Sequence, residues 1–296
     1  MDFSKIPGKI FFDGRFVKSG DAKIHVLNHS LHFATSVFEG IAVYNFKPLF
    51  MDEHYKRFVA SSRLMKLKLN LNKKNFTQIC NKLIKINNID FGYLRPILFR
   101  SSHSMSPDTD LCKTLIAIGA WKWGRLFKKK GISLTVSKYP KLNKNIFPIE
   151  AKSSGSYQSS VISKIDAKKK GFDDCLMLDI KKYVAETSAC NIFWIKKNIV
   201  YTPGENSILS GITRKCIIEI CKKENIKTKV GNFNLNHILS ADNVFATGTA
   251  AEIQLVSRLN LKKFSLDSKI IKLLIEKYKI IKSICPPSVN DLKRIV

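Results

Sequence analysis

The second half of the chain mixes many short strand-like runs with a few helices in no regular order. Helices are expected over about residues 157–170, after Gly211 and over about 266–283. Strand-like runs are expected at 132–139, 174–178, 183–186, 191–195, 198–202, 228–232, 243–247 and 252–257. A doubly wound parallel sheet would need helices that alternate regularly with strands. The order therefore favours a mixed α/β fold whose sheet curls into a distorted barrel.

The first half predicts a smaller α/β domain. The run KIFF-DG-RFV at residues 9–17 is typical of two strands joined by a type I′ turn, because Asp-Gly tolerates the positive φ angles of that turn. Helices are expected from a cap at Asp52 to about Leu67 and from Lys74 to Asn87. Further strands are expected at 37–44, 48–51, 92–99 and 114–121. We therefore divide the chain into a small N-terminal domain (1–121), a connector (122–131) and a larger C-terminal domain (132–296).

The net charge is high, but its pattern argues against an anionic macromolecule as the partner. The formal net charge is +28, and only nine of the 51 basic residues are Arg, which nucleic-acid readers use for bidentate contacts. No apolar run reaches the roughly 18 to 20 residues that cross a bilayer, and the start lacks an apolar signal segment. His25, His29 and His32 lack a neighbouring Cys or acid in a zinc-like pattern. We expect a cytoplasmic protein with no nucleic-acid, membrane or metal partner.

A single lysine, Lys152, stands in the stretch between Lys144 and Lys164. Its immediate neighbours are small residues, Ala, Ser and Gly. An amine attacks a carbonyl only when it is unprotonated, and such neighbours offer no carboxylate to hold the proton and leave room for a bulky aldehyde. Lys152 is therefore a candidate nucleophile, with an ordinary surface lysine in a Ser-rich loop as the alternative.

Three further patterns could serve a ligand, and each has a simpler alternative. Glu186 lies between a strand-like run and small residues, so it could pair with a protonated ring nitrogen or be a solvated strand-end acid. Gly211 precedes a helix whose first N–H groups, at Ile212 and Thr213, could hold a phosphate, although most such helix starts bind nothing. The small residues of TGTAAEI, 247–253, could let the backbone approach a ligand or form a tight turn.

Seven stretches, taken in order, resemble the class IV, or fold type IV, pyridoxal-phosphate aminotransferases, and most closely the branched-chain amino acid aminotransferases. The likeness runs from about residue 8 to residue 290, and seven stretches in order are more specific than any one of them. The stretches are NHSLHFATSVFEGI (28–41), HYKRF (54–58), GYLRPILF (92–99), AKSSGSYQSS (151–160), VAETSACNIF (184–193), LSGITR (209–214) and TGTAAEI (247–253).

The resemblance implies an enzyme with pyridoxal 5′-phosphate as its cofactor. Lys152 would hold the cofactor as a Schiff base and act as the base at the substrate Cα, while Glu186 would keep the pyridine nitrogen protonated. Tyr157 would flank the ring hydroxyl. The phosphate would lie against Arg57 and backbone N–H groups. Those groups and the other implied cofactor contacts belong to Leu209, Gly211, Ile212, Thr213, Gly248 and Thr249.

The same resemblance implies the substrates. Tyr93 and the backbone at Thr249 and Ala250 would receive the substrate carboxylate, and Arg95 the side-chain carboxylate of glutamate. The expected reaction moves the amino group between leucine, isoleucine or valine and 2-oxoglutarate. Rivals within the fold are a D-amino acid aminotransferase, an amine transaminase and an aminodeoxychorismate lyase, against which Tyr93 and Arg95 argue. The alternative from another class is a basic nucleic-acid-binding protein that has kept the fold without catalysis.

Some positions depart from the family pattern near the expected substrate side chain. Phe33 stands where the family usually has Tyr, Ala42 where it usually has Arg, and the loop 101–110 lacks the glycine-rich form common in branched-chain enzymes. Phe33, Phe38 and Tyr157 still make a largely apolar pocket, which suits branched aliphatic side chains. A homodimer or larger assembly is implied, with Phe33 and the loop 101–110 reaching into the neighbour's site.

Overall fold

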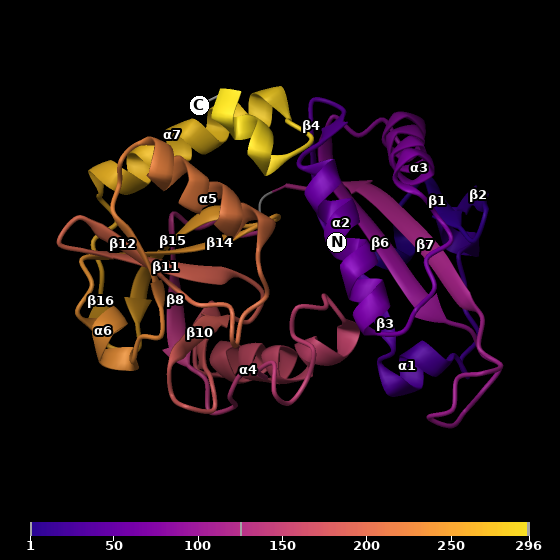
Figure 1. Ribbon diagram of the computed structural model, residues 1–296, viewed down its shortest axis with the longest axis horizontal. Coiled ribbons are helices and arrows are strands. Elements are labelled where there is room, and N and C mark those ends of the chain that lie inside the picture. The colour runs from indigo at the N-terminus through magenta and orange to yellow at the C-terminus, as the bar shows by residue number, and fades with distance from the viewer. Residues whose placement is uncertain (1, 125, 295–296) are drawn as a thin grey trace. The chain divides into compact units, whose positions relative to one another are not determined.

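The structure of the chain is a computed structural model that describes residues 2–124 and 126–294 (Figure 1). Met1, Arg125, Ile295 and Val296, which the predicted domains and connector include, lie outside the described residues. The chain folds into two compact units. The first comprises residues 1–124, 151–155 and 282–288, and the second 125–150, 156–281 and 289–296. The predicted domains are continuous, whereas the structure groups Lys152 with the first unit rather than with the C-terminal stretch.

The first unit is built on an antiparallel sheet with the strand order β2-β1-β7-β6-β4-β5, and β3 pairs with β6. The predicted hairpin is confirmed, because β1 and β2 pair antiparallel across Asp13 and Gly14, whose φ angles are 41° and 93°. The strands are β1 (Lys9–Phe12), β2 (Arg15–Lys18), β3 (Ser36–Phe38), β4 (Ile41–Tyr44), β5 (Lys47–Pro48), β6 (Phe91–Arg100) and β7 (Thr114–Lys122).

Helices α2 (Met51–Leu64) and α3 (Lys73–Ile86) cover one face of this sheet (Figure 1). Leu94 and Leu98 of β6 belong to the core cluster on that face. Because side chains alternate along a strand, Tyr93 and Arg95 point to the opposite face. The shorter elements of the unit are η1 (Phe3–Lys5), η2 (Ser19–Asp21) and α1 (His29–Phe33).

The start of α2 differs from the prediction in two ways. The predicted cap at Asp52 is wrong, because the left-handed Phe50, with φ 53°, precedes the helix and no described side chain caps it. The predicted strand at 48–51 is wrong beyond Pro48, because Met51 already opens the helix. Phe50 and Met51 are 2% and 3% exposed. This apolar run turns into the core instead of pairing in a sheet, and an apolar run of four residues does not distinguish the two outcomes.

The sheet of the second unit closes on itself. Its strand order is β10-β9-β8-β15-β14-β11-β12-β13, and β10 pairs with β11 as well as with β9. These pairings join β10, β9, β8, β15, β14 and β11 into a ring, so the expected barrel-like sheet is confirmed. The strands are β8 (Gly131–Val136), β9 (Asp174–Leu178), β10 (Val184–Thr187), β11 (Asn191–Lys196), β12 (Ile199–Pro203), β13 (Thr228–Gly231), β14 (Asn243–Gly248), β15 (Glu252–Leu259) and β16 (Lys262–Lys263).

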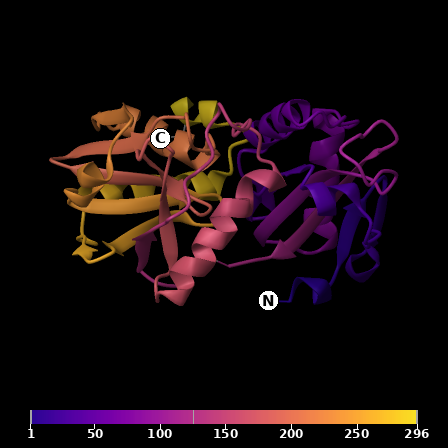
Figure 2. The same ribbon diagram turned by 90° about the horizontal axis from the view of Figure 1, so that it is seen from below.

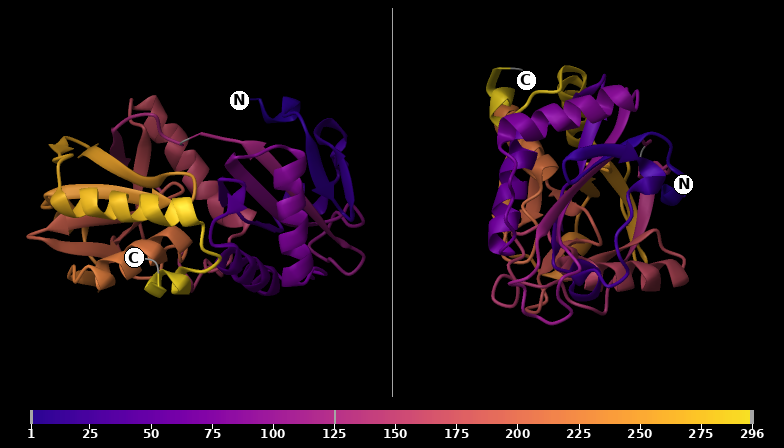
Figure 3. Two further views of the ribbon diagram at one scale, coloured as in Figure 1. Left: turned by 90° about the horizontal axis from the view of Figure 1, so that it is seen from above. Right: turned by 90° about the vertical axis from the view of Figure 1, so that its right-hand side faces the viewer.

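The helices of the second unit lie around its sheet. Helix α4 packs on β9 through a small cluster that includes Ala167, Cys175 and Met177 (Figure 2). Helix α7 runs lengthwise beside the strands (Figure 3, left). None of the helices in the described part of the chain combines the length and the apolar character that crossing a bilayer requires. The elements are η3 (Ser154–Tyr157), α4 (Gln158–Lys169), α5 (Ile212–Lys223), α6 (Leu235–Leu239), α7 (Lys269–Ile284) and η4 (Val289–Arg294).

Candidate active site

Backbone hydrogen bonds fix Lys152 in the first unit. Its N–H donates to Oγ of Ser61 on α2 at 3.0 Å, and its carbonyl accepts from the N–H of Phe38 on β3 at 3.0 Å. The next residue, Ser153, forms an antiparallel bridge with Val37. A helix and a strand therefore hold the main chain on both sides of the lysine, which leaves the side chain to be directed by its own surroundings.

The amine of Lys152 lies in surroundings that favour its neutral form. Burial lowers its pKa to about 8, and the positive charge of Arg57 adds to this effect, while the carboxylate of Glu39 opposes it. Its Nζ lies 4.8 Å from the centre of the Phe38 ring. An amine with this pKa is partly unprotonated near neutral pH, as a nucleophile or a base must be. These surroundings argue against the alternative of an ordinary surface lysine.

A buried acid that the sequence analysis did not single out, Glu39, organises the groups beside Lys152. Arg57 donates from Nε to Oε1 at 2.6 Å and from Nη2 to Oε2 at 2.9 Å, and His54 Nδ1 lies 2.7 Å from Oε2. Burial alone would raise the pKa of Glu39, but Arg57 and His54 hold it well below its usual range. Burial lowers the pKa of His54. The carboxylate and the guanidinium therefore form the charged pair, and the pair fixes the direction of Arg57.

Close packing at Gly40 positions Tyr93. A Cβ atom at Gly40 would lie 1.7 Å from the Tyr93 hydroxyl oxygen, so only glycine leaves room for this ring. Tyr93 is 7% exposed and also packs against Trp121 and Trp123. The structure thus groups Tyr93 with Lys152 in the first unit, whereas the predicted domains separate them.

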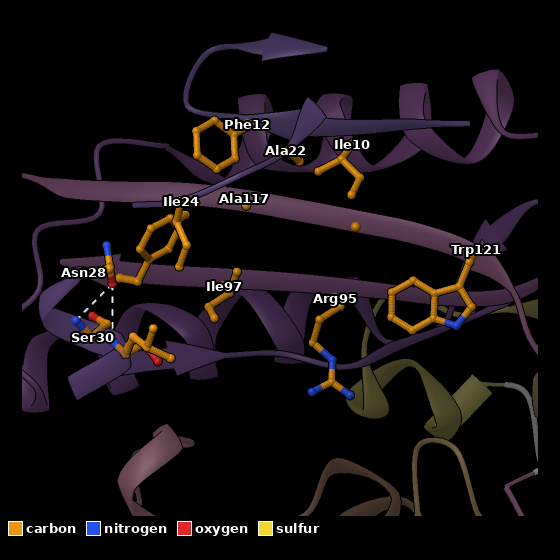
Figure 4. A pocket seen from close by; sticks show the side chains of 14 residues that line it. Ile10, Phe12, Ala22, Ile24, Asn28, Ser30, Arg95, Ile97, Ala117 and Trp121 are labelled. Carbon is orange, nitrogen blue, oxygen red and sulfur yellow. Dashed lines mark hydrogen bonds between the residues drawn. The ribbon is translucent and has the colours of Figure 1, made fainter. Parts of the chain in front are cut away.

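Arg95 and an apolar pocket extend the site in the first unit. The Arg95 guanidinium lies 4.8 Å from the Phe38 ring centre, so Arg95 and Lys152 both contact that ring. Arg95 Nε is buried without a hydrogen-bond partner among the described residues. A pocket of about 420 Å³ opens beside it, and Figure 4 shows the guanidinium extending from the strand. The pocket lining is mostly apolar and includes Ile10, Ile24, Ile97, Ala117 and Trp121.

In the second unit Glu186 is held by two donors that sequence reasoning missed. Lys141 Nζ lies 2.9 Å from Oε1, and Asn191 Nδ2 donates to Oε2 at 3.0 Å. Asn191 also donates to the Leu209 carbonyl at 2.9 Å. Glu186 is 5% exposed, so the alternative of a solvated strand-end acid is wrong. The acid sits in β10 with both carboxylate oxygens directed by neighbours.

The start of α5 joins this network through Gly211. A Cβ atom at Gly211 would lie 1.9 Å from Oδ1 of Asn191, and its φ of −72° is open to any residue. The glycine is therefore needed for space and not for backbone freedom. Within the described residues no side chain caps α5, so the N–H groups of Ile212 and Thr213 have no side-chain acceptor there. Such an end suits an anion.

Gly211→Ala is expected to disturb Glu186 although it touches neither the acid nor a charge. The new Cβ must displace Asn191, which removes the 3.0 Å hydrogen bond to Glu186. We expect a loss of about 1 to 3 kcal/mol in unfolding free energy from the overpacking, together with weaker cofactor retention, measured by urea denaturation and by dialysis of the purified protein. Gly204→Ala is the matched control, because the nearest atoms there are 3.9 Å away. Equal behaviour of the two variants would contradict the account.

The remaining predicted residues of the second unit occupy two places. Gly248, Thr249 and Ala250 lie half-buried where β14 ends, and a Cβ at Gly248 would lie 3.3 Å from the Cys190 sulfur. Tyr157 is half-buried, and its ring centre lies 5.7 Å from Lys141 Nζ. Phe33, in contrast, is 40% exposed, and its ring lies tilted against the ring of His29 with 4.7 Å between their centres.

The site residues that sequence reasoning missed differ in how clearly the sequence could have indicated them. Glu39 lies in FEGI and Asn191 in ETSACNIF, inside two of the seven stretches that carry the family resemblance. Each is a single polar residue next to apolar or small residues. Lys141 has no such signal, because one lysine among many looks like every other until its burial is known.

Comparison with known proteins places the chain in a family. The family described as Amino-transferase class IV matches residues 36–259. A probable branched-chain-amino-acid aminotransferase of Rickettsia bellii is 36% identical over 91% of this chain and 94% of that protein. The branched-chain amino acid aminotransferase of T.th. with pyridoxamine 5′-phosphate superposes with a TM-score of 0.89 at 29% identity, covering 96% of each chain. The same enzyme complexed with N-(5′-phosphopyridoxyl)-L-glutamate gives 0.88 at 29% identity, covering 96% of this chain and 97% of that one. The chain belongs to the class IV aminotransferases.

Proposed function

We propose that this protein transfers the amino group between the branched-chain L-amino acids leucine, isoleucine and valine and 2-oxoglutarate, with pyridoxal 5′-phosphate held at Lys152. The observation that carries the proposal is the amine of Lys152, whose pKa is lowered to about 8 by burial and by Arg57 and which contacts Phe38. The solved relative with pyridoxamine 5′-phosphate and the relative from Rickettsia bellii, named as a branched-chain enzyme, support the cofactor and the substrate class.

The residues present fit this cofactor. In the first unit Lys152 offers an amine for the aldehyde, and Arg57 offers a guanidinium whose direction Glu39 fixes. In the second unit Glu186 offers a buried carboxylate for the ring nitrogen, and the uncapped start of α5 offers N–H groups for the phosphate. The end of β14 and Tyr157 would complete the cofactor's contacts, with Leu209, Gly211, Gly248 and Thr249 among them.

Different side chains of this protein would carry out different parts of the reaction. When bound, pyridoxal phosphate supplies an aldehyde that condenses with amines and a protonated ring that accepts electrons from the substrate Cα. Lys152, as a neutral amine, would take the Cα proton and return it, because its lowered pKa makes both transfers accessible near neutral pH. Glu186 would accept a hydrogen bond from the protonated ring nitrogen and so keep the proton on that nitrogen. Tyr93 would orient the substrate carboxylate with the backbone of Thr249 and Ala250.

The substrate assignment rests on the surroundings of Phe38. An aliphatic side chain suits the aromatic ring of Phe38, whereas the unpartnered Nε of Arg95 suits the second carboxylate of 2-oxoglutarate. One site can then accept an apolar donor and an acidic acceptor in turn. The relative that binds a phosphopyridoxyl-glutamate supports the acidic acceptor.

We also propose that the protein works as a homodimer or larger assembly. Ile24, Val26, Leu27, Leu31 and Phe33 are between 40% and 68% exposed on one short segment. Exposed apolar side chains gathered in this way are typical of an interface. Phe33 and the loop 101–110 would then reach the site of the neighbouring subunit, where Phe33 would add to the apolar pocket.

A panel of amino donors tests the proposed reaction. We expect activity with leucine, isoleucine and valine when 2-oxoglutarate is the acceptor, and none with D-alanine or simple amines. Formation of glutamate is measured for each donor at matched concentrations. Activity with D-alanine and none with the three branched donors would overturn the proposal, and cleavage of aminodeoxychorismate would point to the lyase.

Arg95→Met is expected to separate the two half-reactions. The variant removes the guanidinium but keeps an apolar stem against Phe38. We expect KM for 2-oxoglutarate to rise roughly 10- to 100-fold, because a charge-assisted hydrogen bond contributes about 1.5 to 3 kcal/mol. KM for leucine should change little and serves as the internal control. An equal rise for both substrates would show that Arg95 only supports the fold.

A further inference from the structure

A second buried lysine, Lys141, lies against the acid proposed to face the cofactor. It is 6% exposed, and its Nζ lies 2.9 Å from Oε1 of Glu186 and 3.0 Å from the Ser160 hydroxyl. An ammonium group taken out of water is strongly destabilising unless it is paired. The position of Lys141 is therefore tied to Glu186, and its burial sets it apart from the chain's many surface lysines.

Glu186 is oriented by two partners and keeps room for a third. Lys141 contacts Oε1, while Asn191 donates to Oε2 and is itself fixed by the Leu209 carbonyl. A carboxylate has about four acceptor positions, so two described donors leave capacity for a ring N–H. The Glu186 carboxylate therefore has a fixed orientation and can still accept a further hydrogen bond.

Lys141 carries a positive charge beside the Glu186 carboxylate. Burial alone would lower the pKa of Lys141, but Glu186 holds it above its ordinary value, so the lysine stays an ammonium. The other titratable groups that face it are Tyr157 and Cys175. A positive charge at 2.9 Å attracts the Glu186 carboxylate and holds its Oε1 in place.

We propose that Lys141 is a positioning residue that holds the Glu186 carboxylate in the orientation in which it accepts a hydrogen bond from the protonated pyridine nitrogen of the cofactor. The inference rests on the proposed function, because it presumes that Glu186 faces that nitrogen. Without the ammonium, the Glu186 side chain can turn away from the nitrogen, and the nitrogen loses the acceptor that keeps its proton in place. The ring then withdraws electrons less strongly.

The test follows the ring nitrogen itself. The holoenzyme is prepared with pyridoxal 5′-phosphate labelled with ¹⁵N in the ring, and the nitrogen chemical shift is recorded for wild type, Lys141→Arg, Lys141→Met and Lys141→Gln. We expect the protonated shift in wild type and Lys141→Arg, and a movement toward the neutral shift in the two uncharged variants. Turnover in the uncharged variants should fall about 10- to 100-fold, the range seen when an outer partner of a site ligand is removed.

Lys164→Met is the matched control. Lys164 also pairs with a buried acid of the same unit, Asp174, at 3.3 Å, so the variant removes the same charge from a pair that does not include Glu186. Its ring-nitrogen shift should equal that of wild type. An unchanged shift and turnover in Lys141→Met would overturn the inference.

The outcomes separate this inference from the proposed function. If wild type binds no pyridoxal phosphate or transfers no amino group, the proposed function fails. If wild type does both and the uncharged variants keep the native shift, only the role of Lys141 fails. Should neither uncharged variant fold, wild type and Lys141→Arg decide, because a neutral ring nitrogen in either overturns the inference and a protonated one in both supports it.

Discussion

Lys152→Ala is expected to abolish amino transfer and to remove the absorbance of covalently bound cofactor. The variant deletes the amine that we propose both anchors the cofactor and moves the Cα proton. Loss of the base alone accounts for about a 10⁴-fold fall in kcat at the upper end of the general-base range, and loss of the anchor adds to it. Turnover is measured with leucine and 2-oxoglutarate, and the spectrum is recorded after dialysis.

Lys68→Ala supplies the control for this result. Lys68 is an exposed lysine of the same unit, so the variant makes the same change in charge without touching the site. We expect its turnover to lie within about twofold of wild type, in keeping with the small effects of most surface substitutions. Retention of both turnover and bound absorbance in Lys152→Ala would refute the role of Lys152.

Periodicity predicted most elements of the fold, because the long strands and helices carry strong patterns. The runs at 92–99 and 114–121 became β6 and β7, and the helix expected at Lys74–Asn87 is α3, Lys73–Ile86. The short helices α1 and α6 were missed, although Asn28 and Asn234 cap them with hydrogen bonds to N–H groups at their starts. Five residues give no helical period, so only the capping asparagines could have indicated them.

The site was predictable where chemistry demands a particular residue, and not where packing decides. Lys152 and Glu186 drew notice as an isolated amine and an isolated acid, each with a simpler alternative, and only the resemblance to the aminotransferase family gave them roles. The assignment of residues to compact units followed long-range hydrogen bonds from Lys152 to Phe38 and Ser61, which no local pattern encodes. The same holds for Lys141, whose importance lies in its burial and not in its neighbours along the chain.

Glu39→Gln is expected to be the most destabilising conservative change in the first unit. Glu39 is fully buried and carries the charge that balances Arg57. The amide keeps the shape but leaves the guanidinium without a counter-charge, and breaking a buried pair in this way costs about 3 to 5 kcal/mol. Urea denaturation near neutral pH measures the difference in unfolding free energy.

The difference in unfolding free energy between wild type and Glu39→Gln should change with pH in one direction. The pKa of Glu39 is held below its usual range in the folded chain, since Arg57 and His54 outweigh the opposing effect of burial. Its stabilisation is therefore present above the unfolded pKa of about 4.3 and is lost as the pH falls toward the folded value. The difference in unfolding free energy between wild type and Glu39→Gln should therefore become smaller as the pH falls below about 4.3. A gap that stays constant on acidification would show that Glu39 acts through packing and not through charge.

The same variant also tests the link between Glu39 and the reactive amine. The carboxylate of Glu39 raises the pKa of Lys152, whereas burial and Arg57 lower it to about 8. Removing the carboxylate must therefore lower that pKa further, and the pH at which the apoprotein captures pyridoxal phosphate at half its maximal rate should fall below the wild-type value near 8. Asp174→Asn, which removes a buried acid paired with Lys164, should lose stability without shifting this midpoint. If Glu39→Gln leaves the midpoint in place, the carboxylate of Glu39 does not act on the amine, and its pairing with Arg57 serves only to hold Arg57 in position.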